Sequence, residues 1–221
     1  MGGKVLDYLM AKELIEVFET EGNFYDLNVS GRSHLCRRAL RLSRKGTAAE
    51  KVDAVFIISS PGNCKPIDIN IGDVEGGGYL QMKPKSVEHQ LMRLMEKLRW
   101  DLTYVINLSD LCGRRADDFR SSLHYMGRHF VDQHSIFSPD RSTELNGILA
   151  PETKVIACWG ANALLNEDAS RALKALVGKG KVRGMKHETW PYYYQPSPFL
   201  KRKGLEWLEE MVEQMSDVLV R

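Results

Sequence analysis

The most constraining feature of this sequence is a set of short apolar runs, each of which stops at a cluster of turn-forming or polar residues. Residues 52–58 and 102–108 are almost continuously apolar, residues 155–158 form a shorter run of the same kind, and residues 181–186 form a weaker fourth. Continuous apolar runs of this length are typical of strands that are buried on both faces, as in parallel sheets. We therefore expect four core strands.

Helical spacing of apolar residues separates these runs. It is clearest over 86–98, 161–177 and 205–219, and residues 145–149 end a further helix. Strands that alternate with helices predict an α/β protein, here three α/β/α layers around a four-stranded, mainly parallel sheet. A chain of 221 residues fits one domain. We divide it into a helical, basic segment 1–50, a core sheet 51–204 and a C-terminal helix 205–221.

The N-terminal segment is helical in pattern and unusually basic. Apolar residues from Leu6 to Phe18 keep helical spacing until Gly22 and Asn23, and residues 33–45 fit a helix, with a strand as the alternative. Residues 28–49 contain no acid, which favours a nucleic-acid surface and a solvated helix face about equally. Six cations crowd this stretch: Arg32, Arg37, Arg38, Arg41, Arg44 and Lys45.

Composition excludes several classes of protein. The chain has 31 basic and 29 acidic residues, so its net charge of +2 says little about partners. No stretch approaches the roughly 20 apolar residues that span a bilayer, and acids near the N-terminus argue against a signal peptide. We expect a cytoplasmic protein without membrane contact. The cysteines form no C-x-x-C pair, so we expect free buried thiols and neither a metal nor a cofactor: Cys36, Cys64, Cys112 and Cys158.

Small and amide residues follow each predicted strand, where ligands bind in folds of this class. Ser60-Pro61-Gly62-Asn63 follows the first strand and Asn107-Leu108-Ser109-Asp110 the second, and Trp159-Gly160 and Gln195-Pro196-Ser197-Pro198 follow the others. An Asn at the end of a buried strand can read a nucleobase edge with its carbonyl and amide. It can also cap a turn, and residue type alone favours this role for Asn107.

These four exits, in this order, resemble the uracil-DNA glycosylase superfamily over residues 52–204. VFIISSPGN is similar to the family's water-activating motif, and VINLSDL resembles the strand whose Asn reads the base. VIACWGANA and QPSPFLKRKGL are similar to the family's L-L-W-G-S-H-A and H-P-S-P-L-S segments. Gly78-Tyr79-Leu80 before the helix 86–98 resembles the segment that carries the base-stacking aromatic.

The resemblance implies a DNA partner and a flipped base, in single- or double-stranded DNA. Tyr79 would stack on the base and Asn107 would read its edge, while Phe199 would fill the gap left in the duplex. The resemblance implies that the DNA phosphates are held by Pro61, Gly62, Ser197, Lys201, Arg202 and Lys203.

The positions that would carry the chemistry depart from the family pattern. Ser60 stands where an Asp or Asn orients the water, and Gln195 stands where a His or Asn stabilises the departing base. An amide donor can stabilise an oxyanion, whereas a neutral hydroxyl cannot replace a carboxylate in stabilising a positively charged transition state. Nearby substitutes include Asn63, Asp68 and Asp73, and His187 is another donor.

Three functional hypotheses follow from the sequence. The first is nucleobase recognition in DNA, with the N-glycosidic hydrolysis of base-excision repair as the implied activity. The second is a non-catalytic protein of the same fold that binds nucleic acid, a nucleotide or a protein. The third is a hydrolase of small nucleosides that uses the same pocket.

Overall fold

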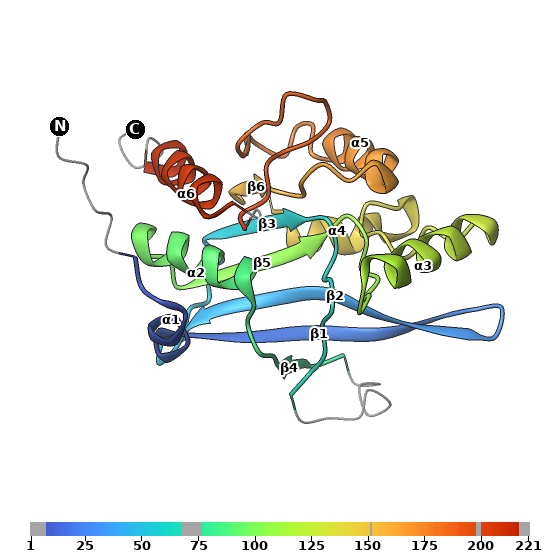
Figure 1. Ribbon diagram of the computed structural model, residues 1–221, viewed down its shortest axis with the longest axis horizontal. Helices are drawn as coiled ribbons and strands as arrows, with labels where there is room; N and C mark the ends of the chain where they lie inside the picture. Colours follow the sequence, from blue (N-terminus) through green and yellow to red (C-terminus); the bar gives the residue numbers. More distant parts are fainter. Residues whose placement is uncertain (1–7, 68–76, 151, 198–199, 217–221) are drawn as a thin grey trace.

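The computed structural model describes residues 8–67, 77–150, 152–197 and 200–216. One mixed sheet runs through this part of the chain in the strand order β4-β1-β2-β5-β3-β6-β7 (Figure 1). Six α-helices are present among the described residues. The α/β class expected from the sequence is confirmed, but the sheet has seven strands in these residues and not four.

The four predicted core strands lie side by side and are parallel to one another. Each predicted apolar run contains one of them, and β3 is buried along its whole length. Their bounds are Ala54–Ile58 for β3, Leu102–Asn107 for β5, Val155–Ala157 for β6 and Val182–Arg183 for β7.

The other three strands are antiparallel, and two of them form a long hairpin where the sequence predicted helices. Strand β1 covers Phe18–Val29 and β2 covers Arg32–Arg44, while β4, Tyr79–Gln81, pairs with the outer side of β1. The helix expected up to Phe18 is the shorter α1, Ala11–Val17. The first helix therefore ends sooner than the expected stop at Gly22 and Asn23, and of the two possibilities for residues 33–45 the strand is the one observed.

A β-bulge explains why the second strand looked helical. Asn23 pairs with Ala39 but Phe24 pairs with Arg37, so Arg38 is an extra residue in β2. The bulge breaks the two-residue alternation, because Cys36 and Ala39 pack on one face of the sheet and Leu40 on the other. The two-residue turn, Ser30-Gly31, has positive φ at both positions, as a tight hairpin requires.

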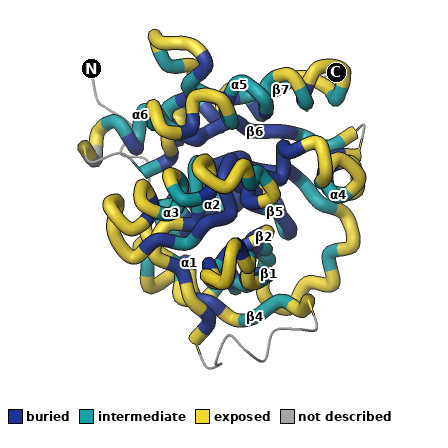
Figure 2. Tube along the Cα trace, turned by 90° about the vertical axis from the view of Figure 1, so that its right-hand side faces the viewer, coloured by how far each residue is buried: buried dark blue, intermediate teal, exposed yellow. Residues whose placement is uncertain are grey.

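Helices cover both faces of the parallel half, so the three predicted layers are present there (Figures 1 and 2). On one face α1, α2 and α6 pack over Phe56 and Leu40. On the other face α3, α4 and α5 pack over Val55 and Ile57. The remaining bounds are α2 Ser86–Leu98, α3 Ala116–Arg128, α4 Ser142–Ile148, α5 Asn166–Ala175 and α6 Lys201–Ser216, with 3-10 turns at Pro139–Arg141 and Ala163–Leu165.

The strand order creates a switch point at the carboxyl edge of the sheet. From β3 the chain passes through α2 on one face to β5, whereas after β6 it enters α5 on the opposite face. Connections that leave adjacent strands toward opposite faces open a crevice between them, and this is where open α/β sheets bind ligands. The topology therefore predicts a ligand site between the ends of β3 and β6, and we call this region the crevice.

The hairpin extends beyond this same edge. The arrowheads of β3 and β5 point to the right in Figure 1, and the turn of the β1–β2 hairpin lies further in that direction, beside α3. Figure 2 looks at the molecule from that side. Among the described helices, none combines the length and apolar character needed to cross a membrane.

Candidate functional site

The crevice brings together three of the segments that the sequence singled out. Ser60 and Gly62 lie in the turn after β3, Gly160 follows β6, and Gln195 packs beside Gly160. A Cβ added at Gly160 would make ordinary van der Waals contact with Oε1 of Gln195, at 3.7 Å, and it is the φ of +73° that favours glycine at this position. The Gly160 amide also donates to the Tyr193 carbonyl at 2.8 Å, which fixes the segment before Gln195 against the end of β6.

Backbone hydrogen bonds join the ends of β3 and β5. The Ser109 amide donates to Ser59 at 3.0 Å, and the Gly113 amide donates to Gly62 at 3.0 Å. Pro61 is buried, whereas Gly62 and Asn63 are exposed. These bonds hold the turn after β3 close to the β5 exit, so the predicted residues Ser60, Pro61 and Gly62 occupy one edge of the crevice.

Asn107 ends β5, but its side chain is fully buried and bonded within the protein. Its Nδ2 donates to the Arg37 carbonyl at 2.8 Å and to Oδ1 of Asp110 at 3.1 Å. Its Oδ1 lies 3.5 Å from an Arg37 Nη2 donor. Both ends of the amide are therefore engaged inside the fold, and Asn107 presents no free edge to a ligand in this conformation.

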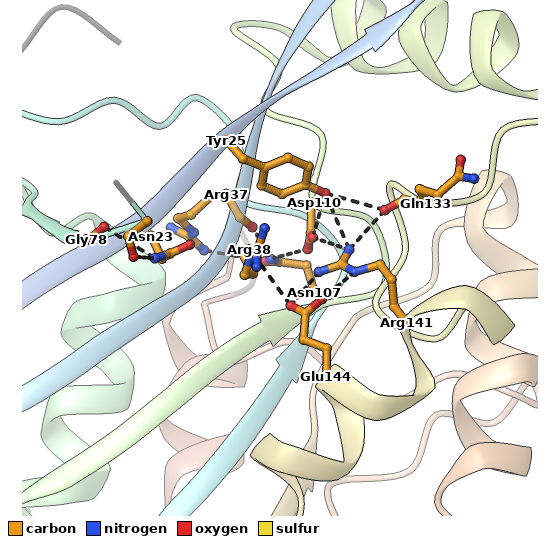
Figure 3. A network of polar contacts seen from close by, with 11 residues as sticks. Asn23, Tyr25, Arg37, Arg38, Gly78, Asn107, Asp110, Gln133, Arg141 and Glu144 are labelled. Atoms are coloured by element: carbon orange, nitrogen blue, oxygen red, sulfur yellow. Dashed lines mark hydrogen bonds and ion pairs between the residues drawn. The ribbon is translucent and has the colours of Figure 1, made fainter. Parts of the chain in front are cut away.

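Asp110 is the centre of a polar network at the end of β5 (Figure 3). Its Oδ2 accepts hydrogen bonds from Arg141 at 2.6 Å and from the Tyr25 hydroxyl at 3.0 Å. Arg141 also donates to Oε1 of Glu144 at 2.8 Å. Burial raises the pKa of Asp110 to about 6, although the Arg141 charge and the bonds from Arg141, Asn107 and Tyr25 lower it. Burial, followed by the Asp110 charge, also raises the pKa of Tyr25.

Arg37, beside this network, is a buried cation with few partners. Its side chain is 0% exposed, and its Nη1 lies 3.7 Å from Glu88 of α2. The Nε and Nη1 atoms have no hydrogen-bond partner among the described residues. Burial lowers the pKa of Arg37, and Glu88 and Asp110 oppose this. The bulge at Arg38 leaves Arg37 facing α2 and turns Arg38 toward α4, where it meets Glu144.

Tyr79 lies on the antiparallel side of the sheet, apart from Asn107. Its ring centre is 6.3 Å from that of Tyr104, and the Arg41 guanidinium lies 5.0 Å from its centre. Burial raises the pKa of Tyr79 to about 12. Tyr104 and Asn107 are three residues apart on β5 and so face opposite sides of the sheet. The described structure therefore does not bring Tyr79 and Asn107 into one pocket.

The predicted phosphate-binding segment is described only in part. Phe199, the predicted wedge, lies outside the described residues, and only the backbone of Lys201 is described. Ser197 is partly buried. Arg202 and Lys203, in the first turn of α6, both pair with Glu206, at 3.1 and 3.9 Å. Their charges are thus partly neutralised within the helix.

The expectation of free thiols is wrong for two of the four cysteines. Cys64, after β3, and Cys112, after β5, form a disulfide with a Cα–Cα distance of 6.0 Å. They are 48 residues apart in sequence, so their pairing depends on the meeting of two strand exits and no local motif signals it. Cys36 and Cys158 are free and buried, as expected.

Sequence reasoning missed Arg37 and Arg141 as members of the site. Arg37 lay in the acid-free stretch 28–49, but the helical interpretation of that stretch hid its position beside β5. Arg141 lies in a 3-10 turn and carries no local motif that would indicate its partner, Asp110. Asp68 and Asp73, considered as substitute carboxylates, lie outside the described residues. The ring of His187 contacts those of Tyr192 and Tyr194, with centres 6.2 and 4.9 Å away.

Within the residues described, no group of three or more His, Cys, Asp or Glu side chains is placed to hold a metal ion. Comparisons with protein-family models, with curated proteins and with solved structures found no significant match.

Proposed function

We propose that this protein recognises a nucleobase in DNA, and that the base enters the crevice between the ends of β3 and β6. The observation that carries the proposal is the switch point of the parallel sheet, where Ser60 follows β3 and Gln195 packs beside Gly160, which follows β6. A side-chain amide offers a donor and an acceptor, the pair that a base edge requires. Gln195 is exposed, so it is free to make such contacts.

The resemblance of the four strand exits to the uracil-DNA glycosylase superfamily supports the choice of a nucleobase as the ligand. It adds a DNA partner and a flipped base, and it places Gln195 at the base-facing position. The burial of Asn107 moves the reading of the base edge from Asn107 to Gln195 in our proposal.

The chemistry of the described site favours recognition of a base without hydrolysis of its glycosidic bond. Asp110 is fully buried and paired with Arg141, and Glu88 is paired with Arg37, so neither carboxylate is free to activate a water. The Ser60 hydroxyl and Gln195 amide offer no base of their own. The second candidate is the glycosylase activity implied by the resemblance, which would need a group outside these residues.

The test is binding and cleavage of labelled oligonucleotides that contain one uracil, hypoxanthine or thymine mismatch, in single- and double-stranded form. Alkali treatment after incubation reveals abasic sites and so separates hydrolysis from binding. We expect binding that weakens as salt rises, because phosphate contacts release counterions, and no strand cleavage.

Gln195→Ala should lower the affinity for the preferred base about five-fold, the effect of about one hydrogen bond. Gln81→Ala is the matched control, because Gln81 is an exposed amide on β4 at the sheet edge. Absence of binding to every oligonucleotide would refute the proposal, and cleavage that Gln195→Ala abolishes would replace it with the glycosylase. A cytoplasmic location is part of the same proposal, and fractionation of cells that express the protein tests it.

A further inference from the structure

The free end of the β1–β2 hairpin and the C-terminal end of α3 form a second surface, which the proposed base crevice does not use. The Tyr125 hydroxyl donates to the Val29 carbonyl at 3.2 Å, and the Ser30 hydroxyl lies 3.1 Å from Nδ1 of His129. These contacts fix the hairpin end to α3. We call the surface formed here by Arg32, Tyr125, Arg128, His129 and Phe130 the hairpin-end surface.

Aromatic rings and cations gather around Tyr125. Its ring centre lies 4.4 Å from that of His129, and the guanidinium carbons of Arg32 and Arg128 lie 5.1 and 6.0 Å from it. The Tyr125 ring attracts both guanidinium groups, so two positive charges lie close together at the surface. The pKa of His34, which also stacks on Tyr125, is lowered by burial and by the Arg32 charge.

The charges of Arg32 and Arg128 are not neutralised by any acid among the described residues. Neither Arg32 nor Arg128 forms an ion pair with a described residue, whereas Arg202 and Lys203 share Glu206. Asp26 is the acid nearest in sequence to the hairpin turn, and it accepts a hydrogen bond from Ser33 at 3.1 Å. Exposed, unpaired arginines held by an aromatic platform are suited to phosphate oxygens.

Phe130 adds an aromatic face in an unusual conformation. Its side chain is 95% exposed, and its φ of 54° places a bulky residue in the left-handed region. A single exposed aromatic is common, and a left-handed residue often ends a helix, but this position is usually a Gly and a Phe is uncommon there. The amide of Phe130 donates to Gly127, and that of Val131 to Met126, which hold this conformation at the end of α3.

A groove lies between the end of the β1–β2 hairpin and the residues that follow α3. It has a volume of about 410 Å³ and is lined by the two chain neighbours of Phe130, His129 and Val131, together with Asn28, Ser30 and Gln133. The volume falls within the range of small-ligand sites. Amide and hydroxyl groups in its walls can bond to a base or sugar. Phe130 lies in the sequence between two of the lining residues, His129 and Val131.

We propose that the hairpin-end surface and this groove bind one nucleotide of a single nucleic-acid strand. The base stacks on Phe130 and enters the groove, while Arg32 and Arg128 hold the flanking phosphates. Residues 131–134 lead from this surface to the β5 exit, where the Asp110 amide donates to the His134 carbonyl. The site lies on the same side of the molecule as the base crevice, so it deepens the proposed function and rests on it (Figure 1).

The experiment measures the affinity of the full chain for a fluorescent single-stranded oligonucleotide of about 12 nucleotides over a series of salt concentrations. Phe130→Ala should weaken binding by between about five-fold and a hundred-fold, the range for loss of one base stack, and Phe130→Trp should retain it. Phe130 is almost fully exposed, so neither substitution removes core packing. An oligonucleotide with 2-aminopurine reports stacking directly, and its quenching should be lost in Phe130→Ala and kept in Phe130→Trp.

Arg32→Gln/Arg128→Gln should reduce the slope of log affinity against log salt by about 1.4, as expected for two phosphate contacts on a single strand. Lys51→Gln/Lys181→Gln is the matched control, because it removes the same charge at two exposed positions before β3 and β7, on the opposite edge of the sheet. The control should leave the slope close to that of the unmodified chain.

The results separate this site from the proposed function. If the unmodified chain binds but both hairpin-end variants bind like the control, the hairpin-end site is refuted while the base crevice stands. If the unmodified chain binds no oligonucleotide, both are refuted. Stronger binding to an acidic peptide than to the oligonucleotide, lost in Arg32→Gln/Arg128→Gln, would assign the surface to a protein partner and overturn the nucleotide site.

Discussion

Replacement of Arg141 by Met should destabilise the protein by an amount that depends strongly on pH. Arg141 neutralises Asp110, which is fully buried, and its side chain is itself only 11% exposed. Removal of one partner of a buried ion pair typically costs about 3–5 kcal/mol, because the remaining charge stays desolvated. We expect a loss of this size in the free energy of unfolding at pH 8.

The pH dependence follows from the pKa of Asp110, which burial raises to about 6 from 3.8. A raised carboxyl pKa stabilises the folded state fully below about pH 4, and this contribution, about 3 kcal/mol, is lost as pH rises through 6. Without Arg141 the pKa of Asp110 rises further, so the variant loses more stability over the same pH range. Burial alone would raise the pKa of Glu144, and Arg141 lowers it. Loss of Arg141 therefore also removes stability at high pH through Glu144.

The assay is urea unfolding of the unmodified chain, Arg141→Met and Asp110→Asn/Arg141→Met at pH 4.5 and pH 8. The destabilisation by Arg141→Met should be much smaller at pH 4.5, and the added Asp110→Asn should recover about 2 kcal/mol or more at pH 8. Equal destabilisation at both pH values, with no recovery in the double variant, would refute the argument that an unpaired Asp110 charge is responsible.

Three further changes test other parts of the structure. Cys64→Ala/Cys112→Ala should lower the free energy of unfolding by about 4 kcal/mol relative to the oxidised chain, the loop-closure value for 48 residues, and an unchanged unfolding midpoint in denaturant would contradict the disulfide. Asn107→Ala should cost about 1–3 kcal/mol in the same assay, because it removes bonds to Arg37 and Asp110 in a buried site; a neutral effect would show that the amide faces solvent. Gly184→Ala should cost at least about 1–3 kcal/mol, since the added Cβ would lie 2.6 Å from Cδ1 of Tyr193, and a melting temperature equal to that of the unmodified chain would contradict this packing.

The parallel half of the sheet was predictable because each strand there is buried on both faces. The apolar run that contains β3 can be read directly, and its end at Ser59-Ser60-Pro61 located the crevice. The helices α2 and α6 were predictable for a similar reason, since each turns one apolar stripe to the sheet, as Leu91 in α2 and Leu208 in α6 do.

The hairpin was not predicted, because its alternation is broken. Leu35, Ala39 and Leu42 have sequence spacings that fit a helix, and the bulge at Arg38 breaks the two-residue alternation that would have indicated a strand. The Ser30-Gly31 pair between two polar-apolar runs was the available signal for a tight turn. Without the hairpin, the contacts of Arg37 and Tyr25 with Asp110 could not be predicted, because they depend on the pairing of β1 with β2 and of β2 with β5.

The site was predictable only to the level of strand exits. Adjacent parallel strands place their carboxyl ends at one edge, so Ser60 and Gly160 had to be near neighbours. The direction of a single side chain depends on contacts from distant segments. Asn107 turns inward because its side-chain NH2 donates to both the Arg37 carbonyl and the Asp110 carboxylate. The local sequence indicates neither contact.

The most direct test of the central claim is a titration of isotope-labelled protein with a short single-stranded oligonucleotide that contains one uracil, followed by backbone and side-chain amide chemical shifts. We predict the largest changes at Ser60, Gly160 and the Gln195 side-chain amide, which line the crevice between β3 and β6. Saturable binding that leaves these three signals unchanged would contradict the placement of the base in that crevice.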